Sequence, residues 1–569
     1  MNTRYFTITD PARESAAVEQ AADILRRGGL LAIPTETVYG LGADGLNADA
    51  VRHIFVAKGR PQDNPLILHI PDASWLARYC KDVPETAYRL AGRFWPGPLT
   101  MILPKADCVP LVTTGGLETV GMRCPDHAVT RAIIAAAGVP VAAPSANTSG
   151  RPSCTTAAHV REDMDGRIDG VVDGGPCRVG VESTIIDLTC TPPRLLRPGG
   201  LPLEELRAVL GEVAVDKAVT QQMAAGERPR APGMKYRHYA PKAPVTVVTG
   251  SPRASARRLL AALGARDGVI CFDEFAPLFA GHIVHRLGAS GDKLAQSQHV
   301  FDALRTFDAT DVPAIWAQCP DSAGLGLAVG NRLKKAAGFH TEEADGAFVL
   351  GITGGTGAGK TTLLHALERR GALVLDCDAV YHEMLRTDAP LRADLTAAFG
   401  DVFAPDGGLD RQKLGNIVFG DAGALAQLDA IIFRHLPRAL ARRMEESGAR
   451  LIALDAIKLV ESGLGALCDV TVAVTAPEEV RVRRIMTRDG ISEDYARARV
   501  RAQRRSRSAR TATRSLKTTT RLPRRLRLPR RSFWIPLLKN PRRNEPWQRR
   551  KRTSGRRSSL MRPRTAMSA

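Results

Sequence analysis

The sequence predicts an α/β protein of several domains, and three observations support this prediction. The chain has 569 residues, more than one hydrophobic core usually organises. Strand-like and helix-like segments alternate along residues 1–503. Polar loops repeatedly follow the strand-like segments, where open α/β sheets build their sites. The expected segments are a first domain (residues 1–212), a linker (213–241), a small α/β domain (242–340), a domain with a parallel sheet (347–503) and a basic tail (504–569).

Composition argues against membrane-spanning and disulfide-rich classes of protein. No apolar run reaches the length of a membrane span, and the N-terminus opens without the apolar core of a signal peptide. The ten cysteines are scattered, and the closest pair, Cys177 and Cys190, is thirteen positions apart. This spacing predicts neither a zinc site nor a disulfide framework. We therefore expect a protein of the reducing cytoplasm.

The net charge of +21 comes from the tail. Residues 504–569 hold 23 Lys and Arg against one Glu, a net +22, which leaves −1 for residues 1–503. A neutral body offers no basic surface from which nucleic-acid binding can be inferred.

Cap and turn residues delimit the elements of the first domain. A helix is expected to open at Asp10-Pro11, with Asp as the N-cap and Pro in the first position, and to end at Gly28-Gly29. Further helices are expected at residues 48–57, 84–94 and 126–137. Strands are expected at residues 30–33, 66–70, 99–103, 119–123 and 139–143.

Residues 57–69 form a loop that suits an anionic ligand. Lys58 and Arg60 lie two positions apart on a loop stiffened by two prolines. The alternative is a solvated loop with two chance cations. Hydroxyls and glycines, which allow a ligand to approach the backbone closely, also follow strands at Pro34–Gly42 and Pro144–Gly150.

Together these loops resemble the threonylcarbamoyl-AMP synthase family. The matching motifs are Pro34-Thr35-Glu36-Thr37-Val38-Tyr39-Gly40-Leu41-Gly42, Lys58-Gly59-Arg60-Pro61, Asn64-Pro65-Leu66…His69, Gly121-Met122-Arg123, Ser145-Ala146-Asn147, Glu182-Ser183-Thr184 and Leu196-Arg197-Pro198-Gly199. The resemblance implies a YrdC-like, open and twisted α/β sheet. It implies synthesis of threonylcarbamoyl-AMP from L-threonine, bicarbonate and ATP, with release of pyrophosphate. Downstream tRNA threonylcarbamoyl-transferase proteins would then use the product to modify tRNA.

The resemblance also implies a role for individual residues. Lys58 and Arg60 would be catalytic and would hold the ATP phosphates, because the reaction needs positioning and charge neutralisation rather than a covalent nucleophile. The other residues implied for ATP are Asn64, Thr119, Ser145, Asn147, Ser153, Arg197 and Tyr236. Those implied for threonine are Thr37, His69, Arg123 and Ser183, with Arg123 paired to the substrate carboxylate.

Some of these residues have a structural alternative. His69, Ser183 and Thr119 could be satisfied residues of strands. Arg123 and Arg197 are flanked by apolar strand residues, where a cation needs an anionic partner.

Three prolines and several cations mark residues 226–241 as a linker. Its stretch Pro232–Pro241 resembles the connector of longer family members, which folds over the active site, and we expect a lid that excludes water. A basic spacer is the alternative. Strands at 245–248 and 268–272 and helices at 251–263 and 292–307 then predict a small Rossmann-like domain. It ends in Gly330–Gly338, also like the long form, and we expect it to support the lid or regulate the site.

A complete P-loop marks the third domain. The strand-like Phe348–Thr353 leads into a glycine-rich loop and a helix expected at 363–370. The residues expected to bind ATP are Gly357, Ala358, Gly359, Lys360, Thr361 and Thr362. Lys360 would reach the terminal phosphates and Thr361 would bind Mg²⁺, so ATP and Mg²⁺ are the expected cofactors.

A strand at residues 372–375 is expected to carry Asp376 and Asp378 on one face, towards the site, with a capped strand end as the alternative. With the P-loop, these aspartates resemble dephospho-CoA kinase, as do Leu409-Asp410-Arg411, Leu454-Asp455…Glu461-Ser462-Gly463 and Arg484-Ile485-Met486…Arg488. The resemblance implies phosphorylation of the ribose 3′-hydroxyl of dephospho-CoA. Asp378 would be the catalytic base or a metal-shell residue, and Arg484 and Arg488 would be lid cations on ATP.

The chain departs from the kinase pattern in two places. The family's Asp-x-Pro-Leu-Leu-x-Glu reads Asp455-Ala456-Ile457-Lys458-Leu459-Val460-Glu461 here, and its His-Pro reads His435-Leu436-Pro437. Both changes concern the expected acceptor site.

After residue 503, Arg, Pro, Ser and Thr dominate and no periodicity is sustained. The tail could be a disordered arm that binds nucleic acid, an inert basic extension, or the product of out-of-frame translation. The last interpretation is favoured, because the switch is abrupt and falls where the kinase family continues into its last strand and helix. It implies a missing closing strand and a kinase that is weak or inactive.

The favoured hypothesis is a fused two-enzyme chain that acts on small molecules, without a membrane and without direct RNA binding. One alternative is an ATP-regulated RNA-binding protein that uses the basic tail. Another is a P-loop domain that phosphorylates a different small nucleotide or alcohol.

Overall fold

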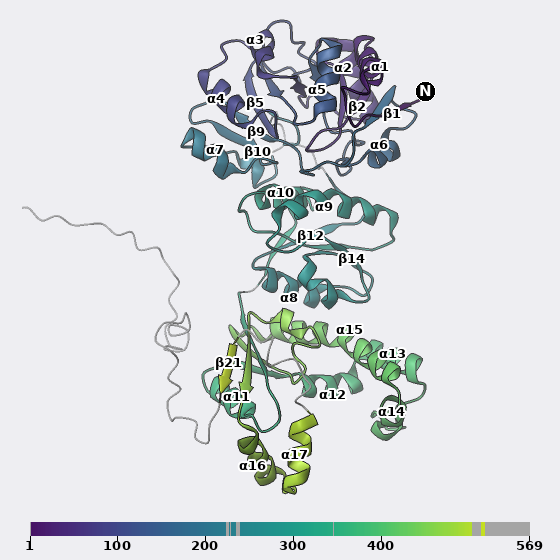
Figure 1. The fold of residues 1–569 in the computed structure, drawn as a ribbon, viewed down its shortest axis with the longest axis vertical. Helices are drawn as coiled ribbons and strands as arrows, with labels where there is room; N and C mark the ends of the chain where they lie inside the picture. The colour runs from purple at the N-terminus through teal and green to yellow at the C-terminus, as the bar shows by residue number, and fades with distance from the viewer. Residues whose placement is uncertain are drawn as a thin grey trace, which may run out of the picture.

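Three β-sheets with their helices follow one another along the chain and are stacked along the long axis of the molecule (Figure 1). The computed structural model describes residues 2–223, 227, 229–234, 239–344, 346–502 and 514–517. The predicted α/β class with several sheets is confirmed. Tyr236 and most of the basic tail lie outside the described residues.

The first sheet is mixed and has eleven strands in the order β1-β8-β2-β3-β7-β4-β6-β5-β9-β10-β11. The strands are β1 (Arg4–Thr7), β2 (Leu31–Ile33), β3 (Gly40–Asp44), β4 (Ile67–His69), β5 (Leu99–Pro104), β6 (Thr119–Arg123), β7 (Val141–Ala142), β8 (Gly170–Asp173), β9 (Thr184–Asp187), β10 (Arg194–Arg197) and β11 (Ala214–Val215). β4 and β6 are parallel, with His69 opposite Arg123. β11 continues this sheet past residue 212, into the segment predicted as linker, and the short 3-10 helix η2 (Lys217–Val219) follows it.

Seven α-helices accompany this sheet: α1 (Ser15–Arg26), α2 (Ala48–Lys58), α3 (Leu76–Tyr79), α4 (Glu85–Phe94), α5 (Ala128–Ala137), α6 (Ala157–Met164) and α7 (Leu203–Leu210), with a 3-10 turn η1 (Ala73–Trp75). The prediction that a helix opens at Asp10 is wrong, because α1 begins at Ser15. The Glu14 carboxylate accepts the N–H groups of Thr9 and Asp10 at 2.7 and 2.9 Å. These bonds hold residues 9–14 in a separate turn before the helix.

The second sheet is entirely parallel, with the order β14-β13-β15-β12-β16. Its strands are β12 (Val245–Thr249), β13 (Gly268–Cys271), β14 (Ile283–Arg286), β15 (Ile315–Gln318) and β16 (Thr341–Glu343), and its helices are α8 (Pro252–Ala262), η3 (Asp273–Phe279), α9 (Lys293–Thr306), η4 (Phe307–Ala309) and α10 (Gly326–Ala336). This arrangement agrees with the predicted Rossmann-like unit. β16 pairs with β12, so residues 341–343 belong to this sheet and do not separate two domains.

The third sheet is also parallel, with the order β18-β19-β17-β20-β21. Its strands are β17 (Phe348–Thr353), β18 (Leu373–Asp376), β19 (Leu451–Asp455), β20 (Val470–Thr475) and β21 (Arg514–Lys517). The helices are α11 (Lys360–Glu368), α12 (Cys377–Thr387), α13 (Ala389–Phe399), α14 (Arg411–Val418), α15 (Ala422–Ser447), η5 (Leu464–Leu467), α16 (Glu478–Asp489) and α17 (Glu493–Ala502). No helix in the described part of the chain is long and apolar enough to cross a membrane.

β21 lies in the segment where we expected neither a strand nor a continuation of the kinase. That expectation is wrong for Arg514–Lys517, which pair in parallel with Val472–Thr475 of β20. A parallel edge strand is held by backbone hydrogen bonds to its neighbour, so four residues can pair without a long apolar run that would mark them in the sequence.

The second and third sheets are joined by one hydrophobic core. Leu259 and Phe272 of the second-sheet domain belong to the same apolar cluster as Leu440 and Leu467 of the third. Arg257 of α8 is buried at this junction and donates hydrogen bonds to the carbonyl oxygens of Leu467 and Ala347, both at 2.8 Å. Its guanidinium also lies 3.3 Å from the Asp469 carboxylate.

We expect Arg257→Met to destabilise this junction. The variant keeps the volume of the side chain but leaves two buried carbonyls and Asp469 without their donor, at a cost of about 2–4 kcal/mol. Thermal unfolding followed by circular dichroism should show a lower transition temperature. Arg258→Met on the same helix, where the arginine is partly exposed and pairs with Glu342 at 2.8 Å, is the matched control and should change the transition little. Equal shifts for the two variants would contradict this account.

Candidate functional site

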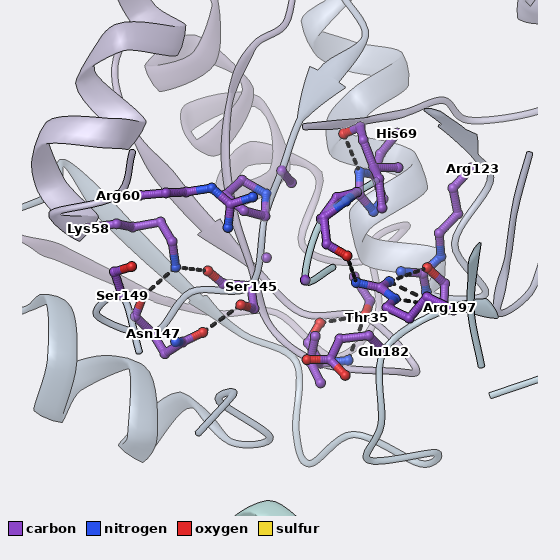
Figure 2. A pocket seen from close by; sticks show the side chains of 18 of the residues that line it. Thr35, Lys58, Arg60, His69, Arg123, Ser145, Asn147, Ser149, Glu182 and Arg197 are labelled. Carbon is purple, nitrogen blue, oxygen red and sulfur yellow. Dashed lines mark hydrogen bonds between the residues drawn. The ribbon is translucent and has the colours of Figure 1, made fainter. Parts of the chain in front are cut away.

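Loops that follow the strands of the first sheet surround one pocket, which opens to solvent (Figure 2). Eight residues predicted for one site line it: Lys58, Arg60, His69, Arg123, Ser145, Asn147, Ser183 and Arg197. Thr35, Glu182 and three linker residues, Pro232, Gly233 and Tyr239, line it as well. In Figure 2, Lys58, Arg60, Ser145 and Asn147 lie on one side, and His69, Arg123, Glu182 and Arg197 lie on the other.

Lys58 links the end of α2 to the loop Pro144–Gly150. It is the last residue of α2, and Gly59 after it takes a left-handed conformation (φ 63°) that turns the chain out of the helix. The buried Lys58 ammonium donates to the carbonyl oxygens of Ser145 and Asn147. Burial, and then the neighbouring Arg60 charge, lower the pKa of Lys58 to about 7. Its charge is therefore sensitive to an anion bound nearby.

Arg123 and His69 are held by adjacent strands. Nη2 of Arg123 donates to the Thr37 hydroxyl at 2.9 Å and lies 2.8 Å from the Glu36 carboxylate, both groups being deeply buried. Nδ1 of His69 is 3.2 Å from the Ile67 carbonyl oxygen. Burial and the Arg123 charge lower the pKa of His69 to about 3, so its ring is neutral near pH 7.

Arg197 lies against Ser183 on the same side of the pocket. Its Nε and Nη2 donate to the Ser183 carbonyl oxygen at 3.1 and 2.9 Å, and Nη2 also donates to the Ser183 hydroxyl at 3.1 Å. Burial lowers the pKa of Arg197 to about 10, although Glu182 opposes this change. Burial would raise the pKa of Glu182, but the Arg332 and Arg197 charges outweigh it and lower this pKa to about 2. Both groups therefore stay charged near pH 7.

Four predicted residues do not line the pocket, and one is not described. Thr37 lies behind Arg123 and bonds to it, and the Ser153 hydroxyl donates to Glu182 Oε1 at 2.6 Å. Asn64 is buried, and its Oδ1 accepts no hydrogen bond from the described residues. Thr119 begins β6 and is not among the lining residues. Tyr236 lies outside the described residues.

Sequence reasoning missed Glu182 and Tyr239 as site residues. Glu182 stands in a motif that was matched as a whole, and its position directly before Ser183 was the available signal. Tyr239 lies three positions from the predicted Tyr236 in the linker, so residue type alone did not distinguish the two.

The P-loop has the expected strand, loop and helix. β17 ends at Thr353 and α11 begins at Lys360. Gly354 has φ 145°, and a Cβ there would lie 2.3 Å from the Val474 carbonyl oxygen, so only glycine fits. The Lys360 ammonium lies 2.8 Å from Asp455 Oδ1 at the end of β19. Burial raises the pKa of Asp455, with Asp376 and Asp378 acting in the same direction and Lys360 opposing them.

The prediction that Asp376 and Asp378 share a strand face is wrong. β18 ends at Asp376, whose carboxylate accepts the N–H groups of Asp378 and Ala379 at 2.9 and 3.3 Å and so caps α12. Asp378 lies in the first turn of that helix and is exposed. Aspartate after a strand is a strong helix N-cap, and here this preference ends the strand.

Only one of the two predicted lid arginines contacts the P-loop. Nη1 of Arg484 donates to the Gly357 and Ala358 carbonyl oxygens at 3.2 and 3.4 Å. Arg488 is exposed and pairs with Asp489 at 2.6 Å. Arg481, one helical turn before Arg484 on α16, donates to the Thr356 carbonyl oxygen at 2.9 Å and was not predicted. Its i−3 spacing from Arg484 was the signal in the sequence.

We expect an anionic ligand such as ATP to take up a proton through Lys58. Phosphate oxygens near the ammonium would raise its pKa above 7, so at pH 7.5 binding should take up roughly 0.5–0.8 proton, and less at lower pH, where Lys58 is already charged. Calorimetry in buffers of different ionisation enthalpy measures this uptake. The measurement is made in a Lys360→Met background, so that ATP bound at the P-loop does not contribute. The control is Lys58→Arg, in which the side chain stays charged near pH 7 and so has no proton to take up. Uptake that persists in Lys58→Arg would contradict the assignment.

Three family models match the chain in order. One described as telomere recombination matches residues 23–199, one described as threonylcarbamoyl-AMP synthase, C-terminal domain, matches residues 201–338, and one described as dephospho-CoA kinase matches residues 348–519. The third match extends past residue 503 and includes β21.

Individual proteins resemble the N-terminal three-fifths of the chain. The threonylcarbamoyl-AMP synthase of Pyrococcus abyssi is 49% identical over 337 residues, which are 58% of this chain and 96% of that protein. That of Bacillus subtilis is 48% identical over 324 residues, 56% of this chain and 93% of that protein. The crystal structure of P. abyssi Sua5 complexed with L-threonine matches with a TM-score of 0.56 and 47% identity, covering 61% of this chain and 100% of that one. The chain therefore belongs to the threonylcarbamoyl-AMP synthase family and carries a dephospho-CoA kinase domain behind its synthase part.

Proposed function

We propose that the first pocket makes threonylcarbamoyl-AMP from L-threonine, bicarbonate and ATP. The observation that carries this proposal is the convergence of Lys58, Arg60, Arg123 and Arg197 on one pocket whose lining holds a single carboxylate, Glu182, among the described residues. This surplus of cations fits a ligand pair with several negative charges, such as a triphosphate beside an amino-acid carboxylate.

Threonine fits the side of the pocket that holds Arg123 and His69. Thr37 and Glu36 fix one edge of the Arg123 guanidinium, which leaves Nη1 to meet the substrate carboxylate. A neutral His69 does not repel the substrate ammonium, whereas a charged imidazole would. The complex of P. abyssi Sua5 with L-threonine supports this substrate.

ATP fits the cations of both sides. In the proposed reaction bicarbonate takes up the proton that the threonine ammonium releases and breaks down to CO2 and water. The free amine then attacks CO2 and loses a second proton to solvent, which forms a carbamate. A carbamate oxygen then attacks the α-phosphorus of ATP, and the bond to the β-phosphate oxygen breaks to release pyrophosphate. Lys58, Arg60 and Arg197 would neutralise the charge that develops on the phosphates. Pro232, Gly233 and Tyr239 of the linker would exclude water from the carbamate.

The product would serve tRNA threonylcarbamoyladenosine formation through downstream transferase proteins, and we propose a cytoplasmic location. The P-loop domain would transfer the γ-phosphoryl group of ATP to the 3′-hydroxyl of dephospho-CoA. The exposed Thr361 hydroxyl and the carboxylates of Asp376 and Asp378 offer oxygen ligands of the kind Mg²⁺ prefers. When bound, Mg²⁺ would neutralise the phosphate charge, and Lys360 would contact the terminal phosphates.

The decisive experiment supplies the full chain with ATP, threonine and bicarbonate. We expect pyrophosphate and an AMP-linked threonine product only when all three are present. Pyrophosphate release that does not depend on threonine would overturn the proposal.

Arg123→Gln should separate the two activities. The variant removes the buried guanidinium that is proposed to pair with the threonine carboxylate. It should therefore lower kcat/KM for threonine by about 100-fold, the equivalent of about 3 kcal/mol. ADP formation from dephospho-CoA should remain unchanged, because the P-loop belongs to a different sheet. Lys360→Met should do the reverse. Loss of both activities in either variant would contradict this prediction, because it would mean that the substitution unfolds the chain or that the two sites are not independent.

We also expect the kinase to be slow because of its altered acceptor motif. The double substitution Ile457→Pro and Lys458→Leu restores the family's pattern and removes only an exposed ion pair, in which Lys458 lies 3.3 Å from Asp429. We expect it to raise the rate of ADP formation about tenfold, or about 1.4 kcal/mol in barrier. Lys458→Leu alone is the control, and a fast wild-type kinase that the double variant does not improve would refute this prediction.

A further inference from the structure

Helix α10 of the second-sheet domain inserts an arginine behind the pocket of the first domain. Arg332 is fully buried (0% exposed). Its Nε donates to Glu182 Oε2 at 2.7 Å, and its Nη1 donates to the Pro198 carbonyl oxygen at 2.8 Å. Glu182 directly precedes Ser183, and Pro198 directly follows Arg197. Arg332, from another domain, therefore bonds to the chain neighbours of both Ser183 and Arg197, which contact each other.

Glu182 is a potential competitor for Arg197. Both residues line the pocket, both stay charged, and each changes the pKa of the other. In the structure Arg197 donates to the Ser183 carbonyl, while the two Glu182 oxygens are occupied by Ser153 and Arg332. A buried carboxylate deprived of its ion-pair partner would draw the nearest remaining cation. After Arg332, Arg197 is the cation whose charge acts most strongly on Glu182, and it would then be neutralised by the protein itself.

We propose that Arg332 is a positioning residue of the synthase: by engaging Glu182, it keeps Arg197 available for the anionic ligand. The inference rests on the proposed role of Arg197 in binding ATP. The same helix also holds the linker, because Lys335 donates to the Gly233 carbonyl oxygen and the Arg332 guanidinium carbon lies 5.7 Å from the centre of the Tyr239 ring. The second-sheet domain thus completes the synthase site, although no residue of it lines the pocket.

The test compares ATP affinity and turnover in the full chain, in a Lys360→Met background so that only the first pocket binds ATP. We expect Arg332→Gln to raise both the Kd and the KM for ATP about tenfold or more, with a much smaller change in the KM for threonine. The double variant Glu182→Gln and Arg332→Gln removes the competitor together with its partner, and should recover most of the ATP affinity. A role in folding alone predicts no recovery in the double variant.

Arg305→Gln is the matched control. Arg305 of α9 is a buried cation at the same interface, 3.0 Å from Asp163 Oδ2, and its guanidinium donates to the Pro152 carbonyl oxygen at 2.7 Å. Neither Asp163 nor Pro152 lines the pocket. The Arg305 guanidinium also donates to the Ser153 carbonyl oxygen at 3.5 Å, so this variant should lower the melting temperature and change the Kd for ATP much less than Arg332→Gln does.

The inference is overturned if Arg332→Gln keeps the wild-type Kd for ATP, or if the folded double variant is no better than the single one. The Kd is measured by calorimetry without turnover, so it separates this inference from the proposed function. Intact ATP binding with no threonine-dependent pyrophosphate in the wild-type chain would refute the function, and the Kd values of the variants would still decide the role of Arg332.

Discussion

Charge buried around one pocket is the constraint on which the N-terminal half depends. Lys58, Arg123, Arg197 and Arg332 are each less than 8% exposed. A buried cation is costly unless it is paired or hydrogen-bonded. Lys58 and Arg197 donate to backbone carbonyl oxygens, those of Ser145 and Asn147 for Lys58 and that of Ser183 for Arg197. Arg123 contacts Thr37 and Glu36, and Arg332 is paired with Glu182.

Only two of these four cations are paired with a carboxylate of the protein. This excess of positive charge favours the binding of an anionic ligand in the pocket. Lys58 and Arg197 are held by neutral carbonyl oxygens, which orient a cation without cancelling its charge. A bound anion would supply the missing charge. The same excess of positive charge accounts for the low pKa of Lys58, because burial without a counter-charge favours the neutral amine.

The second-sheet domain lies between the two sites and contacts both of their domains. Arg332 on α10 reaches the wall of the synthase pocket, and Arg257 on α8 reaches the backbone beside β17 and β20 of the kinase domain. In Figure 1 this teal domain separates the purple and blue first domain from the green third one. Its buried arginines connect it to the domains that carry the two sites.

Much of the fold and of both sites could be predicted from sequence, because the signals were local. The strands β6 (Thr119–Arg123) and β17 (Phe348–Thr353) have the bounds that the sequence predicted, and the P-loop needs only its glycines and Lys360 in order. The errors arose where two local rules competed. Asp376 was assigned to a strand face but caps a helix, and Asp10 was assigned as a cap but lies in a turn closed by Glu14.

The sequence by itself determined which chemical groups each loop carries, since motif order and spacing are properties of the chain. Only the tertiary structure decided how those groups are paired. Glu182 and Arg332 are 150 positions apart and belong to different domains, so no local pattern links them. β21 is a strand only because β20 offers it an edge. Partners of this kind are chosen by packing, and packing depends on all the elements at once.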